Sequence, residues 1–297
     1  MAPDAAAAAP RRGELRWLCA GGAGGGAFLT LRWWEWGPPD GAPVLCVHGL
    51  TRTGRDFDAL AQALANEGRR VLCPDLPGRG ASDWLPDPNL YALPAYVAAL
   101  SHLLARLDGP VDWVGTSLGG LCGMVVAATP GQPIRRMVLN DIGPFVPKAA
   151  LARIRDYVGT EVEFPDLAAL EAHLRAVHAP FGPLTDAQWR HLAETSARPA
   201  AAGGGGAAVK LHYDPGIAVP IRAVEPSDLD LWPLWERIGV PVLVVRGARS
   251  DLLLPETAAR MAARPGVRLA EIPEAGHAPA LMDGAQIGLV RDFLAAP

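Results

Sequence analysis

The chain has 297 residues, of which 50% are hydrophobic and 20% are charged, so it can bury a large core. Its 27 basic and 31 acidic side chains give a formal net charge of −4. This balance argues against a nucleic-acid or membrane partner that is held by bulk charge. No run of residues is apolar enough for a membrane span or a signal peptide. The four cysteines lack metal-ligand spacing and no disulfide framework is expected, so a cytoplasmic protein is predicted.

The first segment of the chain, residues 1–12, is rich in alanine, and we expect it to be a disordered tail. Two strand-like runs follow, Glu14–Cys19 and Phe28–Trp36, with a run of glycines between them. A phosphate-binding glycine loop would need a helix after the glycines, whereas a strand-like run follows here. We therefore predict a β-hairpin turn and no nucleotide cofactor.

From Pro43 onward, short apolar runs alternate with helical stretches, and this alternation indicates βαβ units. The chain is therefore predicted to have an α/β fold, with a parallel sheet and helices on both faces. The expected strands are Val44–Val47, Val71–Cys73, Val111–Val114, Met137–Asn140, Val240–Val245 and Val267–Ile272. The expected helices are Phe57–Leu64, Leu90–Leu107, Leu118–Ala128 and Ala285–Leu294.

The alternation stops between about Gly143 and Trp235. This stretch contains three helical segments, Leu151–Val158, Leu167–His178 and Asp186–Thr195. It is too long for a connecting loop in a compact domain. We predict that residues 143–236 form a helical cap subdomain, inserted into a core made of residues 13–142 and 237–297.

The strongest chemical motif is Gly115-Thr116-Ser117-Leu118-Gly119, which lies between the strand-like VDWV and the helical LCGMVVAA. A sharp strand–turn–helix of this kind exposes a serine hydroxyl as a nucleophile. Acyl transfer also needs backbone N–H groups aimed at the developing oxyanion. The amides of Leu118 and of Leu50, in the segment after the first core strand, are the expected donors. His48 ends that strand, and we interpret it as structural rather than catalytic.

A nucleophilic serine needs a base, and the base needs an acid that orients it. His277 follows the strand VRLAEI, and Asp251 follows the strand PVLVVRG. Together with Ser117 they give the chain order Ser, Asp, His. Asp141, at the end of the strand MVLN, is a second candidate for the acid, and Asp251 is preferred over it.

The segments VHGLTRTGRDF, PDLPGRGAS, VGTSLGG, VRGARSD and EAGHAP occur in an order and spacing that resembles the α/β-hydrolase superfamily. The resemblance covers about residues 12–297. It implies an eight-stranded, mostly parallel sheet with a cap between strands six and seven. It also implies a triad of Ser117, Asp251 and His277, with no cofactor and no metal. The segment Asp75–Gly80 is similar to one that folds beside the oxyanion loop, and we read it as structural.

Within this superfamily the chain looks most similar to small bacterial esterases and ring-cleavage-product hydrolases with helical caps, and ester cleavage is the commonest activity in families of this kind. A small-molecule carboxylic ester with a short- to medium-chain, apolar acyl group is therefore the expected substrate, and hydroxyalkanoate or lactate oligomers would fit. Apolar and aromatic residues of the cap suggest the walls of an acyl pocket, namely Phe145, Val146, Tyr157, Phe164, Phe181 and Trp232. The alternatives are C–C bond hydrolysis or cofactor-free perhydrolysis by the same residues, and a non-catalytic binding protein.

Overall fold

A computed structural model of the chain describes residues 9–22, 25–200 and 207–296. Within these residues, eight strands form one sheet in the order β1-β2-β4-β3-β5-β6-β12-β13. The first two strands are antiparallel to their neighbours, and all pairs from β4 to β13 are parallel. The strands are β1 Arg11–Ala20, β2 Gly26–Trp36, β3 Pro43–Val47, β4 Arg70–Asp75, β5 Val111–Thr116, β6 Ile134–Asn140, β12 Val242–Gly247 and β13 Val267–Ile272. The predicted eight-stranded, mostly parallel α/β fold is confirmed.

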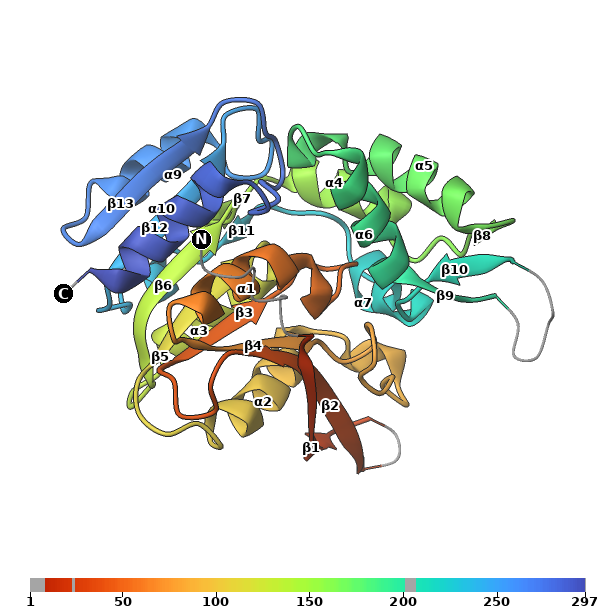
Figure 1. Cartoon of the computed structure of the whole chain (residues 1–297), viewed down its shortest axis with the longest axis horizontal. Helices are drawn as coiled ribbons and strands as arrows, with labels where there is room; N and C mark the ends of the chain where they lie inside the picture. Colours follow the sequence, from red (N-terminus) through yellow and green to blue (C-terminus); the bar gives the residue numbers. More distant parts are fainter. Residues whose placement is uncertain (1–8, 23–24, 201–206, 297) are drawn as a thin grey trace, which may run out of the picture.

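Helices cover both faces of the sheet, as the alternating side chains of the strands require. In β3, for example, Val44 and Cys46 belong to one buried cluster and Leu45 and Val47 to the other. The first cluster includes residues of α1 (Asp58–Asn66) and α10 (Gly284–Ala295). The second includes residues of α2 (Leu93–Leu104), α3 (Leu118–Ala127) and α9 (Pro255–Ala262). Figure 1 shows α1 and α10 together on the near side of the sheet.

The N-terminal hairpin is longer than its two apolar runs predict. β1 and β2 pair from Arg11 with Glu35 to Ala20 with Gly26, and alternate residues of β1 are buried. The sequence predicts a disordered tail over residues 1–12. Residues 1–8 lie outside the described residues. The strand β1 already begins at Arg11, so the last two residues of the predicted tail belong to the sheet.

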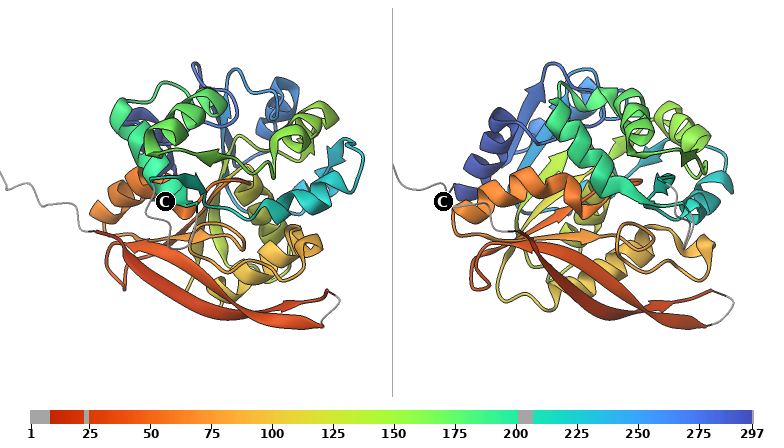
Figure 2. Two further views of the ribbon diagram at one scale, coloured as in Figure 1. Left: turned by 90° about the vertical axis from the view of Figure 1, so that its right-hand side faces the viewer. Right: turned by 45° about the vertical axis from the view of Figure 1, so that its right-hand side comes forward.

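A helical insertion separates β6 from β12, and Figures 1 and 2 show its helices grouped on one side of the sheet. The three helices predicted here are present, with ends shifted by up to three residues: α4 Lys148–Tyr157, α5 Leu167–Val177 and α6 Asp186–Ser196. Shorter elements complete it: β7 Phe145–Val146, β8 Glu163–Phe164, η3 Ala179–Phe181, β9 Ala197–Pro199, β10 Val209–Leu211, α7 Ala218–Arg222, β11 Leu229–Asp230 and α8 Trp232–Trp235. We call this segment the insertion. Its division from the core at residues 143 and 236 stays a prediction.

An ion pair joins the insertion to the core. His191 of α6 lies with its Nε2 3.3 Å from Asp58 Oδ2 of α1 and 3.2 Å from the carbonyl oxygen of Arg55. The Asp58 carboxylate raises the pKa of His191 above its ordinary value.

We expect this pair to make stability depend on pH. Because the folded-state pKa of His191 is raised, its contribution is complete below the ordinary pKa of about 6.5 and is lost as the pH rises through the folded value. The quantity to compare is the free energy of unfolding of the wild type minus that of His191→Gln. This difference should be larger at pH 5.5 than at pH 8.5 by about 0.5–1 kcal/mol. Urea unfolding of both proteins at both pH values measures this difference. An equal difference at the two pH values would contradict the pairing.

Candidate active site

Ser117 occupies the sharp turn between β5 and α3, with φ 52° and ψ −115°. Glycines make this turn possible because neighbouring backbone leaves no room for a Cβ. A Cβ on Gly119 would lie 2.0 Å from the carbonyl oxygen of Val47, and one on Gly115 would lie 2.5 Å from that of Gly119. The predicted strand–turn–helix is therefore present, and it holds Ser117 in a conformation that L-residues rarely adopt.

His277 lies beside Ser117, although the two are 160 positions apart in the chain, and its Nε2 is 3.0 Å from Ser117 Oγ. The loop that carries His277 follows β13 and is fixed on both sides. Gly276 donates its N–H to the carbonyl oxygen of Pro180 in the insertion, and Asn140 Nδ2 donates to that of Pro279. The structure thus brings the predicted nucleophile and the predicted base together.

The acid that contacts His277 is Asp141, not Asp251. Asp141 Oδ2 lies 2.8 Å from His277 Nδ1, and the carboxylate is completely buried. Oδ2 also accepts from Ser250 Oγ at 2.5 Å, and Oδ1 accepts from the N–H of Gly247 at 2.8 Å. These three donors satisfy a buried carboxylate that would otherwise be costly.

The preference for Asp251 as the orienting acid is therefore wrong. Its side chain is 58% exposed, and both oxygens accept from Arg153 of α4 at 2.9 Å. The turn after β12 explains this, because it places Ser250 rather than Asp251 on the inner side. Ser250 Oγ accepts from the backbone N–H groups of Leu252 and Leu253.

The partners of His277 fix where its proton lies. A carboxylate only accepts hydrogen bonds, so Nδ1 carries the proton and donates it to Asp141. Nε2 is then free to accept from the Ser117 hydroxyl. The side chain of His277 is 16% exposed, which leaves room for a substrate and keeps most water away.

The loop after β3 passes close to Ser117, and Leu50 of this loop lines the same cavity as Ser117. Gly49 packs close to Ser117, since a Cβ there would lie 3.7 Å from Ser117 Cβ. The carbonyl oxygen of Gly49 accepts from His48 Nδ1 at 2.7 Å and from the Arg52 N–H at 3.3 Å. Within one trans peptide unit the C=O and N–H point in opposite directions, so these bonds aim the Leu50 N–H the other way. The role of Leu50 as an oxyanion donor stays a prediction.

His48 and the Asp75–Gly80 segment support this loop, in agreement with their structural interpretation. His48 Nε2 accepts from the Leu76 N–H at 2.9 Å, and burial lowers the pKa of His48 to about 3, so the imidazole is neutral. Arg79 donates from Nε to the carbonyl oxygen of Leu50 at 2.8 Å. Its planar guanidinium also bonds Tyr96 Oη and lies 4.8 Å from the centre of that ring.

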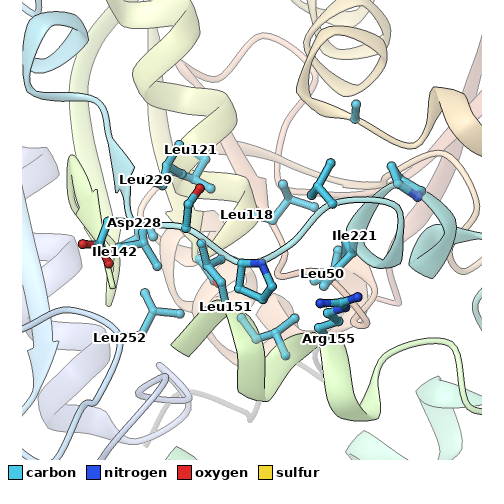
Figure 3. A pocket seen from close by; sticks show the side chains of 18 of the residues that line it. Leu50, Leu118, Leu121, Ile142, Leu151, Arg155, Ile221, Asp228, Leu229 and Leu252 are labelled. Atoms are coloured by element: carbon cyan, nitrogen blue, oxygen red, sulfur yellow. The ribbon is translucent and has the colours of Figure 1, made fainter. Parts of the chain in front are cut away.

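A cavity of about 390 Å³ opens beside Ser117, with Leu50 and Leu118 among its walls. This volume is sufficient for a small ligand. Most of the wall is aliphatic, and Figure 3 shows these side chains around the space. Residues from α3, α4, α7 and the segment after α7 contribute, including Leu121, Leu151, Ile154, Ile221 and Leu229. We call this space the leucine pocket.

The predicted aromatic walls are mostly elsewhere. Of the six insertion residues proposed to line an acyl pocket, Val146 lines the leucine pocket and Tyr157 lines a second cavity. Phe164 and Phe181 instead belong to the insertion's own core, around Trp189. The remaining two are Phe145, which pairs with β11, and Trp232, which lies under the guanidinium of Arg260.

The second cavity has a volume of about 310 Å³, and its wall is more polar than that of the leucine pocket. It begins at Thr51, in the loop after β3 that also carries Leu50 and that we call the oxyanion loop. Tyr157, His173 and His178 contribute to its wall. His178 stacks on Phe181 at 4.5 Å between ring centres, and burial lowers its pKa well below the ordinary value. The oxyanion loop therefore has an apolar cavity at Leu50 and a more polar one at Thr51.

Two general features of the described residues bear on the kind of site. No group of three or more His, Cys, Asp or Glu side chains within them is placed to hold a metal ion, and none of their helices is long and apolar enough to cross a membrane. The four cysteines are buried and have free thiols.

Comparisons with known proteins agree with this geometry. Residues 44–287 match the model of the alpha/beta hydrolase family. Over 294 residues the chain is 46% identical to a 3-hydroxybutyrate-oligomer hydrolase of Cupriavidus necator, with 96% of this chain and 98% of the relative covered.

Solved structures are similar over nearly the whole chain. One from Rickettsia typhi has a TM-score of 0.86 at 30% identity and covers 96% of this chain and 98% of its own. An alpha/beta hydrolase from Novosphingobium aromaticivorans has a TM-score of 0.81 at 37% identity, with 95% and 98% covered. The expectation of an enzyme of the carboxylic ester hydrolase class is confirmed by the family and the Cupriavidus relative. This chain is therefore a member of the alpha/beta hydrolase family.

Proposed function

We propose that the chain hydrolyses carboxylic esters through an acyl-enzyme on Ser117, with His277 as general base and acid and Asp141 as the orienting carboxylate. The observation that carries this proposal is the unbroken hydrogen-bonded series from Ser117 Oγ to His277 to Asp141, at 3.0 and 2.8 Å. Heavy-atom distances of this size are those at which a base can take a proton from a nucleophile.

In the first half of the reaction, Ser117 Oγ attacks the ester carbonyl carbon while His277 Nε2 takes the hydroxyl proton. The carbonyl oxygen becomes negative and receives hydrogen bonds from the Leu50 and Leu118 N–H groups. Leu118 is the first residue of α3, so its N–H has no partner within the helix and lies at the positive end of the helix dipole. Collapse of the tetrahedral adduct breaks the bond to the alcohol oxygen, which receives the proton from His277.

In the second half, a water molecule attacks the acyl-enzyme while His277 Nε2 takes one of its protons. Ser117 leaves with that proton, and the carboxylic acid is released. Asp141 stabilises the imidazolium that forms twice in each cycle, and its bond to Nδ1 keeps the ring in the productive orientation. Because Asp141 is buried and held by Gly247 and Ser250, it has little freedom to turn away.

The substrate class follows from the leucine pocket and from the Cupriavidus relative. An aliphatic pocket next to the nucleophile suits a short apolar part of an ester rather than a sugar or a peptide. That relative is named for hydrolysis of 3-hydroxybutyrate oligomers, which are short chains of ester-linked hydroxy acids. We propose short hydroxyalkanoate oligomers as substrates, with the insertion acting as a cap over the site and the enzyme acting in the cytoplasm.

A panel of substrates tests this function. We expect the wild type to hydrolyse p-nitrophenyl acetate and butyrate and the dimer and trimer of 3-hydroxybutyrate, with no turnover of p-nitrophenyl palmitate, because the cavity is small. Release of nitrophenol and of 3-hydroxybutyrate is measured, with Ser117→Ala as the control. Cleavage of a vinylogous 1,5-diketone without ester hydrolysis above that control would support C–C hydrolysis instead. Formation of a peracid without such ester hydrolysis would support perhydrolysis.

A further inference from the structure

The leucine pocket contains one cationic group among its described walls, the guanidinium of Arg155 on α4. Leu151, Ile154 and Arg155 are spaced by three and four residues, so they share the face of α4 that lines the pocket. Arg153, on another face of the helix, pairs with Asp251. In Figure 3, Arg155 lies beside Ile221, on the side of the pocket opposite Asp228 and Ile142.

The guanidinium of Arg155 is already arranged to hold a carboxylate at two points. Its Nη1 donates to Glu225 Oε2 at 3.0 Å and its Nη2 to Glu225 Oε1 at 3.2 Å. The arginine side chain is only 28% exposed, whereas that of Glu225 is 87% exposed. An acid this exposed is held weakly because water solvates it well in the unpaired state. A carboxylate that enters from the apolar pocket would take the place of Glu225 on the same two donors.

The remaining acidic group of the pocket wall has another partner. Asp228 Oδ1 accepts from the backbone N–H of Lys148, the first residue of α4, at 2.7 Å. This bond keeps Asp228 at the other end of the helix from Arg155. Displacing Glu225 would therefore leave Arg155 as the group in the described pocket wall that is available to an anion.

We propose that Arg155 binds a free carboxylate of the substrate in place of Glu225, so that the enzyme selects esters whose pocket-bound part ends in a carboxylate. This inference rests on the proposed ester hydrolysis at Ser117. It makes Arg155 a specificity-determining residue, which acts on substrate binding and takes no part in proton transfer.

The proposal also sets the direction of the substrate. In a hydroxy-acid oligomer, the free carboxylate lies on the alcohol side of every ester bond. The leucine pocket then holds the leaving alcohol, which is the opposite of the acyl pocket that the sequence suggested. The acyl part would extend toward the more polar cavity at Thr51, Tyr157 and His178. Oligomers would accordingly be shortened from their carboxylate end.

The test compares the 3-hydroxybutyrate trimer as the free acid with its methyl ester at the carboxylate end. A third substrate is the free acid acetylated at its hydroxyl end. For the wild type we expect kcat/KM to be about 10- to 100-fold higher for the two free acids than for the methyl ester, mainly through KM. In Arg155→Gln the ratio of kcat/KM for the free acids to kcat/KM for the methyl ester should fall to about one. Arg153→Gln, which removes a cation from the same helix outside the pocket, should keep the preference.

Removing the internal competitor gives an independent readout. Glu225→Gln should lower KM for the free acids roughly two- to fivefold relative to KM for the methyl ester, because the exposed ion pair of modest strength that competes for Arg155 is lost. Equal kcat/KM for acid and methyl ester in the wild type, or a preference that survives in Arg155→Gln, would overturn the role of Arg155. If Ser117→Ala were as active as the wild type on these substrates, the proposed function itself would fail. The two failures are therefore distinguishable.

Discussion

Replacing Asp141 by asparagine is expected to lower kcat for ester hydrolysis about ten-thousand-fold. An asparagine amide can donate its N–H to His277 Nδ1, which would favour the tautomer that carries the proton on Nε2. In that tautomer Nε2 cannot accept the Ser117 proton, and the 2.8 Å contact that stabilises the imidazolium is lost. Initial rates with p-nitrophenyl butyrate, corrected for the Ser117→Ala background, measure the effect.

Asp251→Asn is the matched control for this change. It replaces the acid that follows the end of β12 at Gly247, on the exposed side, where Arg153 is its partner. We expect kcat within about twofold of the wild type, since exposed ion pairs contribute little. The reverse pattern, with Asp251→Asn inactive and Asp141→Asn active, would restore the preference drawn from the sequence and reject the geometry described above.

Ser117→Ala should show the largest loss, about a million-fold in kcat, because no other group can form the acyl-enzyme. The fold should persist, since an alanine fits the turn at least as well as a serine, and circular dichroism and the melting temperature check this. Ser250→Ala is the matched serine control. It removes a hydroxyl that bonds Asp141 rather than one that faces Nε2, and we expect a loss of roughly tenfold. A loss in Ser117→Ala of only about tenfold, no larger than that in Ser250→Ala, would show that Ser117 is not the nucleophile.

Much of the fold is predictable because the strands have the simple pattern of buried parallel β-structure. The apolar runs at Val44 and Val111 are each followed by a helical stretch, and each forms a strand of the sheet. The glycines around Ser117 were equally informative, since only a very tight turn needs several of them together. What the apolar pattern did not reveal is the small strand pairs of the insertion, such as β7 with β11, which are two residues long.

The choice of acid could not be made from chain position. β6 and β12 are neighbours in the sheet, so Asp141 and Asp251 both follow strands whose ends lie side by side. What decides between them is the backbone after each strand. Asp141 has a φ of 54°, which turns its carboxylate toward His277. The turn at Gly247–Ser250 faces Ser250 inward and leaves Asp251 outside. No sequence pattern signalled either conformation.

The supporting residues of the site were also missed. Asn140 bonds Thr116 and Pro279, and so ties the nucleophile turn to the histidine loop. Ser250, which precedes Asp251 in the chain, bonds Asp141, and no role was predicted for it. A polar residue at the end of a buried strand is the signal that could have pointed to Asn140, because such a side chain must find partners when it is buried. The residues that line the pocket were harder to predict than the triad. An apolar side chain can face either a cavity or a packed core, and Phe164 and Phe181 pack within the insertion.

The most direct test of the central claim is to trap the acyl group during turnover. The enzyme is mixed with p-nitrophenyl butyrate, quenched in acid within milliseconds to seconds, digested and analysed by mass spectrometry. A butyryl group is expected on the peptide that contains Ser117 in the wild type, and none is expected in Ser117→Ala. A butyryl group on another residue, with the Ser117 peptide unmodified while the ester is being hydrolysed, would contradict the mechanism.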